Sequence, residues 1–335
     1  MVAARYEGAA TLEVMDSRPV VPLDPRANRV GWACAAVVLC IWTSFILVAR
    51  SSASGTLSPF DLAFLRFLVS GLVLVALARW RAPRTHTALP TARWAALGVI
   101  AGVAYCGLAY SAFFFAPAAH GAVLLPGSLP LWTALGAWWL LRERPTRQRV
   151  AGLALIAGGD LLVGGASLLH ALDGGTVWIG DLLLLGASAL WGLYTVLCRR
   201  WRVSAFEATL AIGSFCLVSA VPLYALAAAA GWVDSRLGAA PWSEILFQGV
   251  FQGLLSMVVA GIAFTQVVVT FGAVRSTMIT ALVPPIAALA AVPLLGEALA
   301  PTTWFGLAAV TGGLLLGLRG ATARTSVPRP VLEAR

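Results

Sequence analysis

Ten apolar stretches, each long enough to cross a lipid bilayer, follow one another along almost the whole chain. They cover 31–49, 59–79, 94–115, 119–141, 148–169, 178–198, 205–229, 245–270, 274–295 and 302–320. A helix needs about 20 apolar residues to span roughly 30 Å of hydrocarbon. Within a bilayer, only helices and closed barrels satisfy all of their own backbone hydrogen bonds. The sequence therefore predicts an all-α polytopic membrane protein with ten transmembrane helices.

Charged residues are scarce and of an unusual kind. Only 11% of the 335 residues are charged, against about 25% in an ordinary soluble domain. All 23 basic residues are arginine, so mechanisms that need a lysine, such as a P-loop or a Schiff base, are excluded. The net charge of +9 does not indicate nucleic acid as a partner, because the arginines fall in loops between apolar stretches.

The arginines are distributed unevenly between the two sides of the predicted membrane. If the N-terminus is cytoplasmic, every arginine lies on the cytoplasmic side except Arg50, Arg236 and the intramembrane Arg66. This bias follows the positive-inside rule. We therefore expect a multi-pass protein of a cell inner membrane, with cytoplasmic tails at 1–30 and 321–335. The first tail is expected to be disordered, because it lacks a long apolar run.

The chain contains an internal duplication. Pro130, Glu143, Gly152 and Gly159 recur as Pro284, Glu297, Gly306 and Gly313, each 154 residues later. Gly31, Trp42 and Arg50 likewise match Gly180, Trp191 and Arg199. The two copies, 31–169 and 178–320, each contain five apolar stretches, and five is odd, so the copies must cross the membrane in opposite directions. Two inverted five-helix repeats are typical of secondary transporters, with the substrate site near the middle of the membrane between them.

Several of these features together resemble a known family. A tryptophan in the first span of each half, an arginine in the second span and the Pro…Glu…Gly…Gly pattern are similar to the drug/metabolite transporter superfamily, EamA type. The resemblance covers roughly residues 30–318. It implies a ten-helix carrier that exports amino acids, other metabolites or toxic compounds, often in exchange for protons. Thr146 and Gly192 follow the family pattern, whereas Ala300 and Thr43 depart from it.

Candidate residues of a substrate cavity lie near the middle of the spans. Pro130, Pro284 and Pro285 interrupt the fourth and ninth stretches, where proline kinks a helix and frees a backbone carbonyl. The other candidates are Trp42, Tyr105, Tyr110, Ser128, Trp191, Tyr194, Phe264 and Thr280. Aromatic walls suit an apolar or cationic ligand. The alternatives are plain packing kinks for the prolines, core or lipid contacts for the aromatics, and bonds to their own helix for Ser128 and Thr280.

Two ionisable residues, Arg66 and Asp160, lie well inside the predicted spans. A charge at the bilayer centre costs about 2.5–3.5 kcal/mol on insertion scales. For Arg66 the alternatives are a structural contact and a functional role. For Asp160 they are a structural hydrogen bond and proton coupling. Glu143 and Glu297 are expected to stabilise the start of the helix that follows each of them and to order the loop before it. His120 is expected to be a hydrogen-bonded residue at the outer interface, with titration near neutral pH as the alternative.

These observations predict a secondary transporter that exports amino acids or related small metabolites by alternating access. The alternatives are a multidrug or toxic-compound efflux carrier, or a channel or non-transporting membrane sensor. An enzyme is not expected, since no HExxH or GxSxG motif occurs. Neither a cofactor nor a metal is expected, because the five cysteines lie in apolar stretches without a CxxC pair. The expected partners are the lipid bilayer, a small-molecule substrate and a coupling proton or ion. Substrate, coupling ion and oligomeric state are left open.

Overall fold

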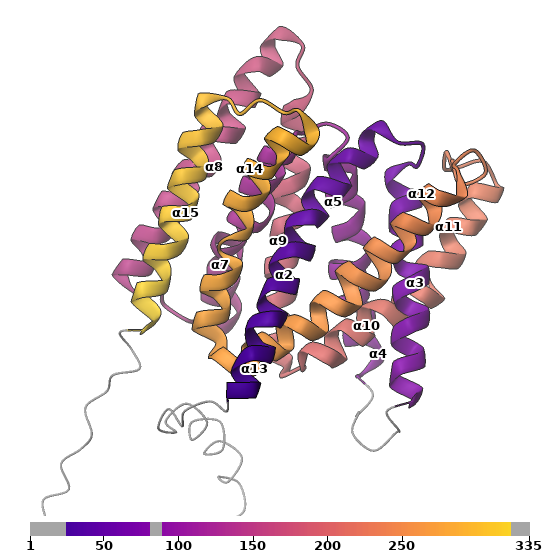
Figure 1. The fold of residues 1–335 in the computed structure, drawn as a ribbon, viewed down its shortest axis with the longest axis horizontal. Helices are drawn as coiled ribbons and strands as arrows, with labels where there is room; N and C mark the ends of the chain where they lie inside the picture. Colours follow the sequence, from indigo (N-terminus) through magenta and orange to yellow (C-terminus); the bar gives the residue numbers. More distant parts are fainter. Residues whose placement is uncertain (1–24, 81–88, 323–335) are drawn as a thin grey trace, which may run out of the picture.

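The protein is a bundle of tilted helices joined by short loops (Figure 1). The structure, a computed structural model, describes residues 25–80 and 89–322. Within these two ranges all regular structure is helical and no strand occurs. The helix α2 begins, and the helix α15 ends, at the same end of the bundle, as Figure 1 shows. The predicted all-α fold is confirmed.

The helices fall into two sets that follow the duplication. The first set is α2 (Pro25–Ser51), α3 (Pro59–Trp80), α4 (Thr91–Leu97), η2 (Gly98–Ala104), α5 (Tyr105–Ala112), α6 (Ala118–Ala122), η3 (Val123–Gly127), α7 (Leu129–Leu141) and α8 (Arg147–His170). The second set is α9 (Val177–Trp201), α10 (Ala205–Val218), α11 (Ala220–Ala229), α12 (Trp242–Gln248), η5 (Gly249–Val259), α13 (Ala260–Thr280), α14 (Val283–Leu295) and α15 (Pro301–Thr322). Two short turns, η1 (Ser52–Ser54) and η4 (Ala171–Asp173), follow α2 and α8.

Neighbouring elements join to form the predicted membrane spans. In the described part of the chain, nine helical stretches are long and apolar enough to cross a bilayer. The helix α15 coincides with the predicted tenth span, has 22 residues and packs along α8. Gly272, at φ 78°, breaks α13 and so separates the eighth span from the ninth. A total of ten spans remains our prediction.

Equivalent helix starts in the two halves use the same local chemistry. At the start of α3, the Ser58 amide donates to Asp61 Oδ2 at 2.8 Å, and the Asp61 amide donates to Ser58 Oγ at 3.2 Å. At the start of α10, Ser204 and Glu207 exchange the same two bonds at 2.9 and 3.3 Å. Such a capping box satisfies backbone donors that have no partner within the helix. The sequence match between these two segments is therefore also a structural match.

A seam of glycines joins α8 to α15, which lie side by side in Figure 1. A methyl group on Gly152 would lie 2.7 Å from the Gly313 carbonyl oxygen, and one on Gly313 would lie 2.5 Å from that of Gly152. Gly159 and Gly306 are related in the same way, at 2.6 and 2.9 Å. Small residues allow such close backbone approach between membrane helices. Because Gly152 matches Gly306 and Gly159 matches Gly313, the two halves make reciprocal contacts, as inverted repeats require.

Several other contacts between the halves occur in matched pairs. The helix α2 packs on α13 as α9 packs on α5, and α14 packs on α2 as α7 packs on α9. The helix α3 packs on η5 as α10 packs on η2, and the equivalent helices α3 and α10 pack on each other. Both η2 and η5 are π-helical and occupy equivalent positions in spans three and eight. Elements of both halves therefore meet at every one of these interfaces.

Candidate functional site

Spans four and nine are both broken at their prolines. The first part of span four ends at Ser128, and Pro130 lies in the first turn of α7. Span nine breaks after Thr280, and Pro284 and Pro285 lie in the first turn of α14. A break inside a membrane is tolerated only where protein or a cavity surrounds it. The structure thus places both breaks at the positions that the prolines predict.

Ser128 and Thr280 hydrogen-bond their own helix backbone. Ser128 Oγ donates to the Leu124 carbonyl at 2.6 Å, and its side chain is fully buried. Thr280 Oγ1 donates to the Thr277 carbonyl at 3.2 Å. This is the structural alternative considered above, in which a hydroxyl satisfies a nearby carbonyl of its own helix.

Five of the six predicted aromatic residues, all except Tyr110, form two groups. Trp42 packs on Phe264 with ring centroids 5.1 Å apart, which joins spans one and eight. Trp191 lies between Tyr105 and Tyr194, at 4.8 and 5.0 Å, which joins spans three and six. The tilted geometry is usual for aromatic pairs. Each group therefore contains residues of both halves.

Arg66 reaches from α3 to the place where spans one, three and eight meet. Its side chain is buried, with 6% of the residue exposed. Its contacts are Nη1 to the Gln252 carbonyl (3.3 Å), Ser256 Oγ (3.2 Å) and Tyr110 OH (3.5 Å), Nη2 to Met257 Sδ (3.5 Å), and the guanidinium over the Phe45 ring (5.7 Å). All these partners are neutral.

A chain of hydrogen bonds continues from Tyr110 to the end of span one. Tyr110 OH donates to Gln252 Oε1 at 3.0 Å, Gln252 Nε2 to Gln248 Oε1 at 3.2 Å, and Gln248 Nε2 to Ser52 Oγ at 2.8 Å. Both glutamines are buried. Sequence reasoning missed them. The signal was available, because two amides four residues apart in an apolar span lie on one helix face and need partners.

Two ion pairs join the halves, one at each end of the bundle. Arg50 Nε lies 2.8 Å from Glu297 Oε1, and Arg199 Nη2 lies 2.6 Å from Glu143 Oε1. The two arginines are equivalent in the duplication, and so are the two glutamates. Each pair thus joins the end of the first span of one half to the end of the fourth span of the other half.

The two ion pairs differ in their surroundings. Arg50 Nη1 also donates to the Phe113 carbonyl at 2.9 Å, and the Ala118 amide donates to Glu297 Oε2 at 2.8 Å. The Arg50 and Glu297 side chains are 30% and 14% exposed, against 48% and 44% for the other pair. The Arg50–Glu297 pair therefore also holds the loop between spans three and four.

These pairs correct the sequence expectation for the two glutamates. We expected Glu143 and Glu297 to stabilise the starts of α8 and α15, but both carboxylates bind arginines that are distant in the chain. The start of α8 is capped by Thr146, whose Oγ1 accepts from the Arg149 amide at 3.2 Å. A residue four positions before a helix thus serves a contact between the halves.

The intramembrane acids have contrasting surroundings. Asp160 is buried in α8, and neither of its carboxylate oxygens has a hydrogen-bond partner among the described residues. Asp181 Oδ1 instead lies 2.9 Å from His120 Nδ1, and its Oδ2 accepts from Ser167 Oγ. His120 thus has a hydrogen-bond partner, as expected of a satisfied interface residue. Sequence reasoning missed Asp181, although an acid inside the apolar stretch 178–198 was a signal.

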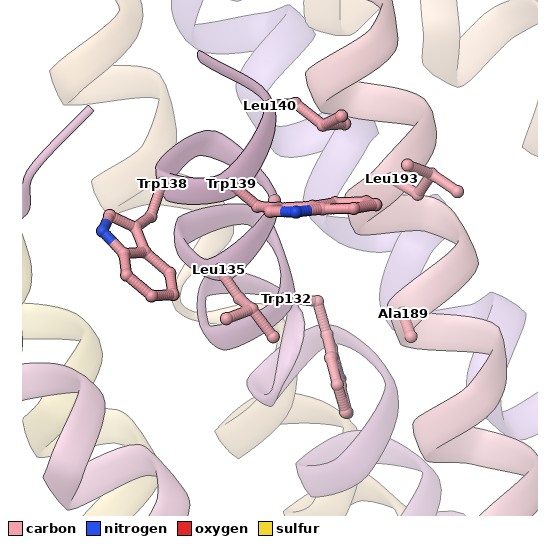
Figure 2. Close-up of a pocket in the computed structure, with 8 residues that line it drawn as sticks. Trp132, Leu135, Trp138, Trp139, Leu140, Ala189 and Leu193 are labelled. Atoms are coloured by element: carbon pink, nitrogen blue, oxygen red, sulfur yellow. The ribbon is translucent and has the colours of Figure 1, made fainter. Parts of the chain in front are cut away.

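The pocket in Figure 2 lies between α7 and α9 and is apolar. It is lined by Trp132, Leu135, Gly136, Trp138, Trp139, Leu140, Ala189 and Leu193. Trp139 reaches from α7 toward Leu193, whereas Trp138 points to the other side of α7 (Figure 2). Trp138 and Trp139 are 55% and 72% exposed, as is usual for tryptophans at the edge of a bilayer. This groove contains none of the predicted cavity residues.

The fold and these contacts define a polytopic membrane protein built from two inverted repeats that meet at mirrored interfaces. Residues 30–165 and 178–319 each match the EamA-like transporter family. The chain therefore belongs to the EamA-like transporter family. The two matches coincide with the two halves of the duplication, and the resemblance drawn from the sequence is confirmed.

Relatives and one solved structure are consistent with this assignment. An "Uncharacterized transporter" of Archaeoglobus fulgidus is 29% identical over 187 residues, 54% of this chain and 62% of the relative. The "Uncharacterized transporter YyaM" of Bacillus subtilis is 25% identical over 193 residues, 56% of this chain and 60% of the relative. The chain thus spans about 60% of the length of these relatives. Their names indicate a transporter rather than an enzyme.

A crystal structure titled only "Crystal structure of protein" is similar over 87% of this chain and 96% of its own, with a TM-score of 0.56. Its sequence is 22% identical to this chain, so the likeness concerns the fold alone.

Proposed function

We propose that this protein is a secondary transporter that exports amino acids or related small metabolites across the inner membrane by alternating access. Membership of the EamA-like family supports transport. The observation that carries alternating access is the pair of mirrored contacts, Arg50–Glu297 and Arg199–Glu143.

Alternating access requires the halves to separate at one end while they stay in contact at the other. Each ion pair joins one half to the other at one end only, so each can break while the other persists. The Arg199–Glu143 pair is solvent-exposed, and such a pair contributes about 0–1 kcal/mol, so breaking it costs little. The extra contacts at Arg50 and Glu297 favour the closed state at that end.

The aromatic groups support a substrate with an apolar or cationic part, because a ring face attracts both. Because these aromatic groups also suit apolar compounds, efflux of toxic apolar compounds is the second candidate function. A channel fits less well, since a fixed pore does not need matched contacts at both ends.

Two experiments test the proposal in sequence. Metabolite profiles of medium from overexpressing and deletion cells should differ in at least one amino acid or related metabolite. That compound should then enter liposomes containing the purified protein with saturable kinetics, and an unlabelled internal pool should accelerate its entry. Empty liposomes are the control. Linear flux without counter-exchange would show a channel, and no flux at all would refute transport of that compound.

A further inference from the structure

The charge of Arg66 has no counter-ion in the described part of the protein. The ion pairs found there involve Arg50, His120, Arg199 and Arg236, not Arg66. A charge inside the hydrocarbon costs about 2.5–3.5 kcal/mol on insertion scales. Hydrogen bonds from the guanidinium to neutral oxygens are already charge-assisted, and a carboxylate would add the attraction between opposite charges. The neutral groups around Arg66 therefore leave room for a stronger, anionic partner.

The contacts of Arg66 occupy only one corner of its guanidinium. All three oxygen acceptors, on Tyr110, Gln252 and Ser256, lie within reach of Nη1. Nη2 has only the Met257 sulfur at 3.5 Å, a weak acceptor, and Nε donates to none of the described residues. Adjacent N–H groups of a guanidinium form a fork that matches the two oxygens of a carboxylate. The Nε–Nη2 edge is thus free of oxygen acceptors among the residues that the structure describes.

The fold itself does not require an arginine at this position. The segment that begins at Ser58 recurs from Ser204, so the equivalent of Arg66 is Ile212 in α10. Ile212 is 2% exposed and packs in the core without any charge. The two helices are equivalent in the duplication, but only one of them carries a charge at this position. The guanidinium therefore has a role other than packing the core.

Arg66 also lies where movement of the halves would reach it. Its neighbours come from α2 and α5 of the first half and from η5 of the second half. The π-helical turns of η5 supply the Gln252 carbonyl and Ser256, and π-helical segments frequently mark functional sites. A relative movement of spans three and eight would therefore uncover the guanidinium.

We infer that the Nε–Nη2 edge of Arg66 binds the carboxylate of the transported substrate. This rests on the proposed function and narrows it, because the substrate class becomes small molecules with a carboxylate. Tyr110, Gln252 and Ser256 hold the guanidinium through Nη1 and are positioning residues. The aromatic groups Trp42–Phe264 and Tyr105–Trp191–Tyr194 remain available for the rest of the substrate.

The first test uses the wild-type protein alone and does not depend on any variant. The probes are the twenty standard amino acids, benzoate and lactate, together with the amide and the decarboxylated amine of each amino acid. Thermal unfolding of the purified protein is measured at constant ionic strength. At least one acid should raise the unfolding temperature saturably, and its amide and amine should bind about 10- to 100-fold more weakly, the ratio expected for about 1.5–3 kcal/mol.

The second test assigns this discrimination to Arg66. Arg66→Gln and Arg66→Ile, the latter chosen to match Ile212 of the other half, should lose the preference for the acid, whereas Arg66→Lys should keep part of it. Ser256→Ala, which removes one of the three oxygen acceptors that position the guanidinium, should reduce the preference for acid over amide without abolishing it. If the charge-neutral variants do not fold, Arg66→Lys and Ser256→Ala, which both keep a cation, decide: an unchanged ratio of acid to amide affinity in both would refute the site.

Three further results would overturn the inference: no acid stabilises the wild type, amide and amine stabilise it as well as the acid, or Arg66→Gln keeps the preference. The fate of the proposed function is separate. If an acid binds through Arg66 but shows no saturable flux into liposomes, transport of that acid is refuted and the binding site at Arg66 is still supported. If the amine and the acid both show saturable flux to the same extent, transport is supported and the carboxylate site at Arg66 is refuted.

Discussion

Arg50 and Glu297 lie 247 positions apart in the chain, yet Arg50 Nε donates to Glu297 Oε1 across 2.8 Å. The equivalent pair, Arg199 and Glu143, is separated by only 56 positions and makes the same kind of bond at the other end of the bundle. The duplication thus supplies two versions of one contact, and each version serves as the control for the other.

Reversal of one charge in the first pair should impair transport, and reversal of both should restore it. Arg50→Glu places two carboxylates together and should hold that end open, while Arg50→Glu with Glu297→Arg recreates the attraction. The single variant should lose about 1–3 kcal/mol of stability, because the Glu297 side chain is only 14% exposed and loses its cationic partner. Counter-exchange in liposomes and thiol labelling of a cysteine at Ala118 measure the two effects.

The same exchange at Arg199 and Glu143 should impair transport without increasing labelling at Ala118. If the single and double variants of both pairs transport like the wild type, the ion pairs have no part in the cycle.

Gly159→Ala should destabilise the protein, whereas Gly158→Ala should not. A methyl group at Gly159 would lie 2.6 Å from the Gly306 carbonyl, while one at Gly158 meets nothing within 4 Å. Overpacking costs about 1–3 kcal/mol, and Gly→Ala in an unobstructed helix gains about 0.5–1 kcal/mol. Thermal unfolding in one detergent should separate the two neighbours, and equal shifts would contradict the close approach of α8 and α15.

Trp42→Ala and Trp191→Ala should raise the KM for substrate or change its range, because each tryptophan belongs to an aromatic group that contains residues of both halves. Trp80→Ala and Trp304→Ala should leave transport unchanged, since these side chains are 81% and 48% exposed. Initial rates in liposomes at matched protein content give the comparison. Equal effects at all four positions would point to general packing.

Asp160→Asn should leave the fold intact and test proton coupling. Both oxygens of this buried carboxylate lack partners among the described residues, so replacing it by a neutral amide of similar shape removes no hydrogen bond seen in the structure. If Asp160 carries the coupled proton, the variant loses transport driven by a proton gradient but keeps counter-exchange, which needs no net proton movement. If gradient-driven transport survives as well, Asp160 is structural.

Reporter fusions should confirm the membrane topology. Fusions after Arg147 and Arg202 should report the cytoplasm, and fusions after Asp173 and Arg236 should report the opposite side, as the arginine distribution predicts. A cytoplasmic signal after Asp173 would refute the ten-span topology.

The spans and their breaks could be predicted because the bilayer imposes them locally. Every stretch of about 20 apolar residues must form a helix to satisfy its backbone, and Pro130 and Pro284 disrupt their helices wherever the rest of the chain lies. The glycines of the α8–α15 seam were predictable for a related reason, since their repeat at fixed spacing appears in the sequence itself.

The partners of the polar groups could not be predicted in the same way. The helix-start rule applied to Glu143 and Glu297 considers only sequence neighbours, and arginines 56 and 247 positions away bind them instead. Ser128 was a cavity candidate because it lies near Pro130, with a bond to its own helix as the alternative. The assembled structure shows that its hydroxyl donates to the Leu124 carbonyl, a direction that sequence position alone does not give. For Arg66, only the assembled bundle shows that the neighbouring groups are neutral.

The reciprocal seam of α8 and α15 has a consequence for assembly. A surface on which Gly152 meets Gly313 while Gly159 meets Gly306 is isologous, the kind found between identical subunits of a dimer. The two halves thus correspond to the two subunits of an antiparallel homodimer, but they are joined in one chain and differ in sequence. Tethering allows the subunits to differ, and a true homodimer would have had to carry Arg66 twice or not at all.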